Sequence, residues 1–255
     1  GGFNGIIDEI RAYNRTLNGG EIAEIANIRL RLNFDETSGE EIYDFSGYGT
    51  NCSKGSASRI EGKYLNGLSF NGSEQLALEE NANLKLGQSL TVSAWVKTSD
   101  IPETFVTIIT KQSENIRNYG LFVSGAAQGA DEGKIVFSMT SGTQNDWKSA
   151  TSAISIVDGQ WHQITGTYNG SQMKIFIDGL EQGSADVSVI PADTSNGVLI
   201  GTGYKGIIDE IRIYDLAIQP SEILFKTDYF YEEQCDDGNN SNNDGCSAVC
   251  FLENL

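Results

Sequence analysis

Short runs rich in β-branched and aromatic residues, each ended by a turn, follow one another through most of this chain of 255 residues. Within the runs, apolar and polar residues alternate, which is typical of strands with one buried face. Tight-hairpin pairs, Asn-Gly or Asp-Gly, begin at positions 71, 158, 169 and 178. The expected strands cover residues 28–34, 65–70, 76–78, 90–97, 104–111, 119–124, 134–140, 162–168, 173–177, 198–201 and 207–214. This pattern predicts an all-β fold, a two-sheet antiparallel jelly-roll sandwich, because one open sheet would leave an apolar face in water.

One stretch of sequence occurs twice. Residues 3–14 (FNGIIDEIRAYN) return as residues 204–215 (YKGIIDEIRIYD), at an offset of 201 residues. A constant offset without a gap indicates one structural element in two copies, separated by the length of a domain. We therefore expect residues 1–27 to hold the closing strand and short helix of a preceding copy, residues 28–228 to form the jelly roll, and residues 229–255 to form a cysteine-rich tail.

The first copy of the repeated strand has no sheet of its own in this domain plan. Its apolar residues Phe3, Ile6, Ile7 and Ile10 would lie exposed unless another sheet accepts them. Strands of this kind add to the edge of a neighbouring sheet. The sequence thus predicts head-to-tail assembly with neighbouring copies, as a tandem array or a filament. Packing of the segment on its own domain is the alternative.

The formal net charge of −18 excludes some classes of partner. Such a field repels phosphate backbones, so we expect no nucleic acid partner. No stretch approaches the roughly 18 consecutive apolar residues of a membrane-spanning helix, so we expect no membrane insertion. Cations are the natural ligands of so acidic a surface.

Four cysteines are present, and three of them lie within the last 21 residues. Cys235, Cys246 and Cys250 belong to a segment too rich in Gly, Asn and Asp to build an apolar core, which favours disulfides. Cys52 is the fourth disulfide candidate, and the pairing stays open. Because disulfides persist in oxidising compartments, we expect a secreted or cell-surface protein.

Seven segments resemble the laminin G-like / concanavalin A-like lectin-glucanase superfamily in its bacterial and archaeal cell-surface form. They are LNFDETSG (32–39), YDFSG (43–47), GLSFNG (67–72), LTVSAWVK (90–97), DGQWHQITGTYNG (158–170), KIFIDG (174–179) and GIIDEIRIY (206–214). The resemblance covers most of residues 28–226 and implies a jelly roll. The tail segment CDDGNNSNNDGCSAVC (235–250) is similar to a myxobacterial-type cysteine-rich repeat that lacks its upstream cysteine. Cys52 either replaces that cysteine or stays free.

We expect no enzymatic activity. Hydrolases of this superfamily carry Glu-x-Asp-x-x-Glu on one strand, where alternate carboxylates share a face, and no such triplet occurs here. The single histidine, His162, lies in an expected strand without a nearby nucleophile motif, and we interpret it as structural.

Calcium is expected as a structural ion, because it accepts carboxylate, amide and carbonyl oxygens from separate loops. The resemblance implies that Asp209 occupies the position that holds a structural calcium in related jelly rolls. By the same resemblance, Asp35, Asn71 and Gly72 would supply further oxygens. The alternative is that Asp209 and its neighbours form cross-strand ion pairs.

Sugar binding requires exposed aromatic rings flanked by polar side chains. The candidates are Tyr119, Trp147 and Tyr204, and burial in the core is an equal alternative for Trp147. The leading interpretation is a non-catalytic extracellular module for adhesion or structural assembly. The alternative is a carbohydrate-binding, lectin-like module of a larger secreted protein.

Overall fold

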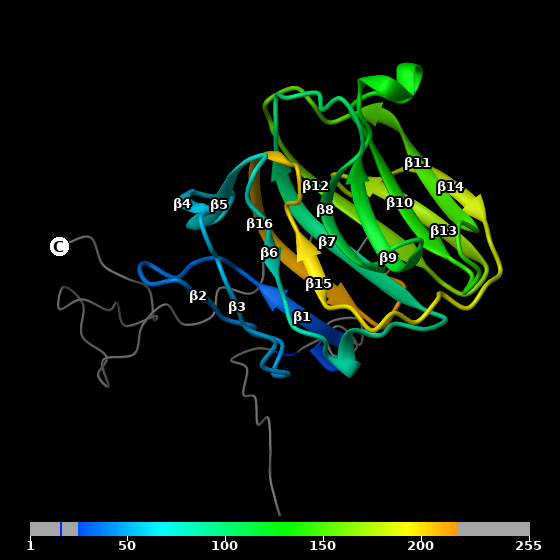
Figure 1. The fold of residues 1–255 in the computed structure, drawn as a ribbon, viewed down its shortest axis with the longest axis horizontal. Helices are drawn as coiled ribbons and strands as arrows, with labels where there is room; N and C mark the ends of the chain where they lie inside the picture. Colours follow the sequence, from blue (N-terminus) through cyan, green and yellow to red (C-terminus); the bar gives the residue numbers. More distant parts are fainter. Residues whose placement is uncertain (1–15, 17–24, 219–255) are drawn as a thin grey trace, which may run out of the picture.

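The structure is a computed structural model that describes residue 16 and residues 25–218. Its strands form an eight-stranded and a six-stranded antiparallel sheet that face one another, and a small two-stranded sheet (Figure 1). The prediction of an all-β sandwich of two sheets is confirmed. Every described helix is short, and none in this part of the chain is long and apolar enough to cross a membrane.

The sheets draw their strands from distant parts of the sequence. The eight-stranded sheet contains β1 (Ile28–Leu32), β4 (Ser58–Glu61), β5 (Asn66–Asn71), β7 (Leu90–Lys97), β12 (Trp161–Tyr168), β13 (Gln172–Ile177), β14 (Leu180–Asp186) and β16 (Lys205–Tyr214). The six-stranded sheet contains β6 (Leu76–Ala77), β8 (Val106–Ser113), β9 (Ile116–Val123), β10 (Lys134–Thr140), β11 (Trp147–Ser155) and β15 (Val198–Ile200). The remaining elements are β2 (Glu41–Ile42), β3 (Cys52–Ser53) and the 3-10 helices η1 (Ala82–Leu84) and η2 (Ala126–Asp131).

The repeated segment forms the central strand β16. It pairs with β7 along one edge, and with β5 and then β1 along the other. The expected closing strand of the domain is therefore a strand with neighbours on both sides. Its first copy, residues 3–14, and the cysteine-rich tail, residues 229–255, lie outside the described residues, so these parts of the domain plan stay predictions.

Alternating side chains fill the space between the two sheets. On β10, Ile135, Phe137 and Met139 belong to the core cluster, which also contains the inward-facing residues of β7 and β12. Phe137 reaches across to the opposite sheet, where a Cβ on Gly166 would lie 2.6 Å from its ring. A glycine at this position thus lets the large ring pack directly against the backbone of β12.

Five strands do not appear in the sequence pattern: β2, β3, β4, β11 and β14. Three of them, β4, β11 and β14, lie at sheet edges, and β11 (WKSATSAIS) and β14 (LEQGSAD) are rich in Ser, Ala, Gly and charged residues. β11 and β14 also face each other, because a Cβ on Gly183 would lie 2.1 Å from the carbonyl oxygen of Thr151. Contact between edge strands stabilises them where their own periodicity is weak.

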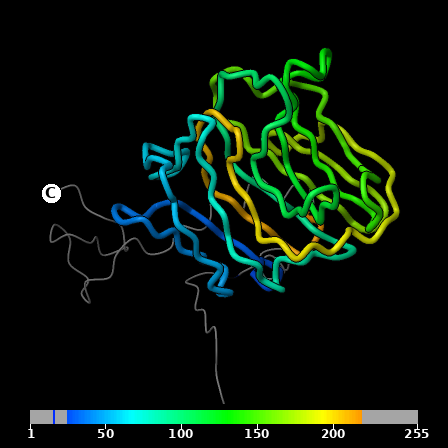
Figure 2. Tube along the Cα trace, viewed as in Figure 1, coloured from blue at the N-terminus to red at the C-terminus, as the bar shows by residue number. Residues whose placement is uncertain are grey.

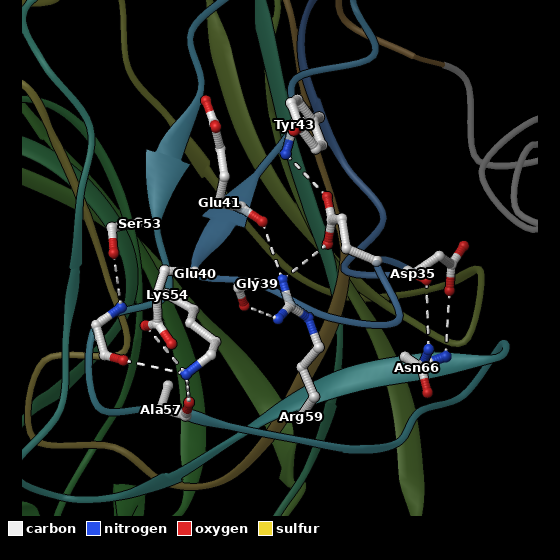
Figure 3. A network of polar contacts seen from close by, with 12 residues as sticks. Asp35, Gly39, Glu40, Glu41, Tyr43, Ser53, Lys54, Ala57, Arg59 and Asn66 are labelled. Atoms are coloured by element: carbon white, nitrogen blue, oxygen red, sulfur yellow. Dashed lines mark hydrogen bonds and ion pairs between the residues drawn. The ribbon is translucent and has the colours of Figure 1, made fainter.

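The loops between β1 and β4 are held by Arg59 of β4 (Figure 3). Its guanidinium donates to the carbonyl oxygens of Gly39 and Glu41, the latter at 2.9 Å. It also lies 3.6 Å from the Glu36 carboxylate. In Figures 1 and 2 these loops, drawn in blue, lie at the opposite end of the sandwich from β11 and β14. The polar network therefore adds to the apolar packing of Phe34, Ile42 and Ala57 at that end.

Candidate functional site: an aromatic and polar sheet face

The outer face of the six-stranded sheet carries an aromatic and polar surface. Because Phe137 points into the core, its neighbour Ser138 and the next alternate residue, Thr140, point outward. Thr140 pairs in register with Trp147, the first residue of β11. The Trp147 side chain is 41% exposed. Of the three aromatic ligand candidates, Trp147 is thus the one that a ligand could reach.

An arginine lies between two aromatic rings on this face. The guanidinium carbon of Arg117 is 4.5 Å from the centroid of the Trp147 ring and 4.0 Å from that of Phe122. Its Nε donates to Gln112 Oε1 at 2.9 Å. Both ring contacts are within cation–π range. We refer to Gln112, Arg117, Phe122 and Trp147 together as the Trp147 face.

The backbone positions these side chains. The hydroxyl of Thr140 accepts a hydrogen bond from the Arg117 amide at 3.0 Å and donates to the Arg117 carbonyl at 3.2 Å. A Cβ on Gly120 would lie 2.5 Å from the Phe122 ring, so the glycine lets this ring lie close to the strand. Burial lowers the pKa of Arg117 to about 10. Because this value is still well above neutral pH, the guanidinium remains cationic. The Trp147 face is therefore a fixed aromatic surface with a positive charge inside it.

The prediction that Tyr119 and Tyr204 are exposed ligand residues is wrong, because both side chains are buried. Tyr119 lies on the core side of β9 with Leu121 and Val123, and its hydroxyl donates to the Leu84 carbonyl at 3.2 Å. Tyr204 packs edge-on against Phe70. The alternation of β9 contains the signal, since Tyr119, Leu121 and Val123 share one face.

Sequence reasoning missed Arg117, Phe122 and Gln112. They lie on β8 and β9, and Trp147 lies on β11, with β10 between them. Sequence periodicity assigns each residue to a face of its own strand, but it does not say which strands are neighbours. Only the pairing order of the sheet brings the arginine to the tryptophan.

A second polar cluster lies where β5 and β1 meet along β16. Asp209 is fully buried, and its Oδ2 accepts the amides of Lys63 and Tyr64 at 2.9 and 3.0 Å. Asp35 Oδ1 accepts the Asn66 amide at 3.1 Å. Both carboxylates thus hold the loop between β4 and β5. A Cβ on Gly62 would lie 2.7 Å from Asp209 Oδ2, so this loop requires a glycine there.

The four residues expected to bind calcium are not brought together. Asp35 is close enough to Asp209 for its charge to raise the pKa of Asp209, although burial and the charge of Glu210 raise it more. Asn71 pairs with Lys205, four residues from Asp209 along β16, and a Cβ on Gly72 would contact the Lys205 side chain. The Asn71 carboxamide instead accepts the Ser73 amide at 3.1 Å. The prediction that all four residues bind one calcium ion is therefore corrected. Only the two aspartates remain as candidate ligands.

The two aspartates fit a metal poorly. Both oxygens of Asp209 already accept backbone amides, since Oδ1 accepts the Glu210 amide at 2.7 Å. Nowhere in residues 25–218 do three or more His, Cys, Asp or Glu side chains form a group that could hold a metal ion. Calcium at Asp35 and Asp209 stays a prediction.

His162 bridges two turns. It makes hydrogen bonds to Asp178 at 2.8 Å and to Asp158 at 3.1 Å. Burial alone would lower the pKa of His162, but these two carboxylates outweigh it and raise the pKa. Both ring nitrogens of His162 thus bind carboxylates that belong to two turns, which favours a structural role for this residue.

Cys52, the disulfide candidate inside the described region, is a free and buried thiol. Burial, followed by the charges of Glu36 and Asp44, raises its pKa to about 12, so the thiolate is scarce at neutral pH. The other candidates, Cys235, Cys246 and Cys250, lie outside the described residues. Their pairing stays a prediction.

Solved structures with a similar fold are binding domains. The binding domain of Paraclostridial Mosquitocidal Protein 1 superposes with a TM-score of 0.66 at 15% identity, over 82% of this chain and 54% of that one. The binding domain of botulinum neurotoxin DC in complex with SialylT gives 0.64 at 16%, over 81% and 52%. This chain thus spans about half the length of these toxin domains.

A smaller structure matches over nearly its whole length. Domain 4 of AbnA, an extracellular arabinanase from Geobacillus stearothermophilus, in complex with arabinotriose, superposes with a TM-score of 0.62 at 19% identity. The match covers 78% of this chain and 97% of that domain. At these identities the likeness shows the fold.

Comparison with curated protein sequences gave no match. A family model described as the concanavalin A-like lectin/glucanases superfamily matches residues 70–224, which is more than half of the chain. The match includes the strands that carry the Trp147 face. The chain therefore belongs to the concanavalin A-like lectin/glucanases superfamily.

Proposed function

We propose that this protein is a non-catalytic, secreted glycan-binding module whose ligand lies on the Trp147 face. The observation that carries the proposal is the exposed Trp147 ring, whose centroid lies 4.5 Å from the guanidinium carbon of Arg117. Aromatic rings stack on the apolar faces of sugar rings, and flanking amides and hydroxyls bind the sugar hydroxyls. Gln112 and Ser149, which pairs with Ser138 beside Trp147, supply such groups.

The similar folds support a binding role. One of these neighbours was solved with arabinotriose and another with SialylT. Here, the buried acids do not resemble a catalytic pair, because Asp209 is enclosed and its oxygens accept backbone amides. A general acid must reach the glycosidic oxygen. Binding without hydrolysis is the function that these residues favour.

Replacing Trp147 by alanine is expected to weaken glycan binding at least tenfold, because the stacking ring is lost. A glycan array identifies the ligand, and isothermal titration calorimetry then compares the variant with the unchanged protein. Stability should change little, since Trp147 is partly exposed at an edge strand.

Tyr43→Ala is the matched control, because Tyr43 is similarly exposed, at 47%, but follows β2 at the other end of the sandwich. Equal affinities for the Trp147→Ala variant and the unchanged protein would place the ligand elsewhere. Loss of glycan binding in the Tyr43→Ala variant alone would also place the ligand elsewhere.

Assembly through residues 3–14 is a second proposed function. Its support is that the matching segment, β16, has paired neighbours along both edges. A second copy of a strand with this sequence would need two neighbouring strands as well. Deleting residues 1–25 is then expected to abolish concentration-dependent oligomers in light scattering. A full chain that stays monomeric at all concentrations would contradict assembly.

A further inference from the structure

We propose that the Trp147 face selects glycans that carry an anionic group, a carboxylate or a sulfate, and that Arg117 binds this group. The inference deepens the glycan binding proposed above and depends on it. Its basis is that the Arg117 guanidinium has no carboxylate partner among the described residues.

Arg117 differs from three other arginines of the described region, each of which pairs with a carboxylate. Arg29 pairs with Asp215, Arg59 with Glu36 and Arg212 with Glu210. The Arg117 guanidinium has two ring contacts and one hydrogen bond, from Nε to Gln112, and no carboxylate partner within residues 25–218. Its terminal amino groups, Nη1 and Nη2, make no hydrogen bond there and are not enclosed. Two charged donors are thus available to a ligand.

The geometry favours a particular kind of ligand group. The rings of Phe122 and Trp147 lie 4.0 and 4.5 Å from the guanidinium carbon, and Gln112 occupies Nε. The edge of the guanidinium formed by Nη1 and Nη2 remains available to a ligand. This edge matches the two oxygens of a carboxylate or sulfate, which accept paired hydrogen bonds. A sugar ring stacked on Trp147 would carry such a group toward the Nη edge.

The charge pattern of the sheet agrees with this choice. The strands of the six-stranded sheet contain four basic residues, Lys111, Arg117, Lys134 and Lys148, and no Asp or Glu. This is notable in a chain with a net charge of −18. The three lysines pair with acids outside the strands, at 2.6, 2.8 and 2.5 Å respectively. Arg117 alone among the four keeps its charge for a ligand.

The overall negative charge does not prevent this binding. Exposed charges are screened beyond about 8 Å at physiological ionic strength. A ligand group on Arg117 therefore senses chiefly the charges of the sheet face, while distant carboxylates slow its approach without cancelling the contact. Affinity for an anionic glycan is then expected to fall with added salt because the Arg117 contact itself is weakened.

The test uses matched polysaccharides that differ only in charge. Polygalacturonate is compared with its full methyl ester, and dextran sulfate with dextran, by affinity electrophoresis and calorimetry with the full chain. We expect the anionic member of at least one pair to bind at least tenfold more tightly. The uronate pair reports carboxylate recognition, and the dextran pair reports sulfate recognition. Preference in either pair supports the inference and identifies the group.

Arg117→Gln and Arg117→Lys separate charge from shape. Glutamine should reduce binding of the anionic member to the level of its neutral partner, and lysine should restore less than half of the preference because it lacks the planar fork. Melting temperatures check that both variants are folded. If Arg117→Gln keeps the full preference, the assignment to Arg117 is wrong.

The outcomes distinguish this inference from the proposed function. A chain that binds neutral glycans through Trp147 but shows no preference within either pair is a glycan-binding module without charge selection, which overturns the inference alone. A chain that binds no glycan on the array and none of the four polysaccharides overturns both.

Discussion

Replacing Phe137 by alanine is expected to lower the free energy of unfolding by about 4 kcal/mol, the typical cost of removing a buried phenylalanine. Phe137 is fully buried, and its ring packs on Gly166 of the opposite sheet. The ring therefore fills the space between the layers, and neither backbone can move in to close the cavity. Urea denaturation followed by tryptophan fluorescence measures the change.

Two further variants test the reason for this loss. Phe105→Ala removes a phenylalanine that is 49% exposed, so it should change stability by less than about 0.5 kcal/mol. Phe137→Leu keeps most of the volume and should cost less than half as much as alanine. A loss below about 1 kcal/mol for Phe137→Ala would mean that this ring does not pack between the sheets. Glycan affinity of the folded Phe137→Leu variant should be unchanged, since Ser138 and Thr140 keep the outer face.

The stability of the protein is expected to fall by several kcal/mol as the pH rises from about 4 to about 8, because of Asp209. Burial, together with the charge of Glu210, raises the pKa of this carboxyl from 3.8 to about 8. Between these values the folded state keeps a proton that the unfolded state has released. The free energy of unfolding therefore decreases with rising pH, by up to about 1.4 kcal/mol for each unit of pKa difference.

Asp209→Asn tests this dependence, because asparagine resembles the protonated carboxyl and does not titrate. The variant should lose most of the slope above pH 6. The slope between pH 4 and 6 should persist in part, since Asp35 has a pKa raised to about 6, chiefly by burial. Urea titrations of both proteins in EDTA, at intervals from pH 4 to pH 8.5, measure the slopes. Equal slopes above pH 6 would refute the role of Asp209.

The same titration in excess Ca²⁺ tests the predicted calcium site. Calcium would bind the ionised forms of Asp35 and Asp209, so it should stabilise the protein most at high pH and flatten the slope. An identical slope in Ca²⁺ and in EDTA would contradict calcium at these residues. The pH dependence itself would stand, because it follows from burial.

The Trp147 face depends on rigid strands rather than on loops. The backbone of Arg117 is held by the Thr140 hydroxyl, which accepts from its amide and donates to its carbonyl, and Trp147 begins the strand that pairs with Thr140. Side chains fixed in this way lose little conformational freedom when a ligand binds. The arrangement would therefore favour the proposed glycan binding, because ordering the binding side chains would cost little free energy.

The central strands were predictable from sequence, and the edge strands were not. The central strands β7, β12 and β16 have neighbours on both sides and strong β-branched alternation, so local pattern and tertiary environment agree. The edge strands β11 and β14 have weak patterns, and their contact with each other is a tertiary interaction. Trp147, the residue on which the proposed glycan binding depends, lies on such an edge strand.

The amino-acid sequence by itself determined the sandwich, since periodicity and turn residues specify which side of each strand is buried. It also revealed the repeated segment and, through the net charge, predicts no nucleic acid partner. Only the tertiary structure decided that Tyr204 is buried, that Asn71 is apart from Asp209, and that Arg117 meets Trp147. The physical reason is that a strand's pattern encodes its faces but not its neighbours, and binding surfaces form from side chains on neighbouring strands.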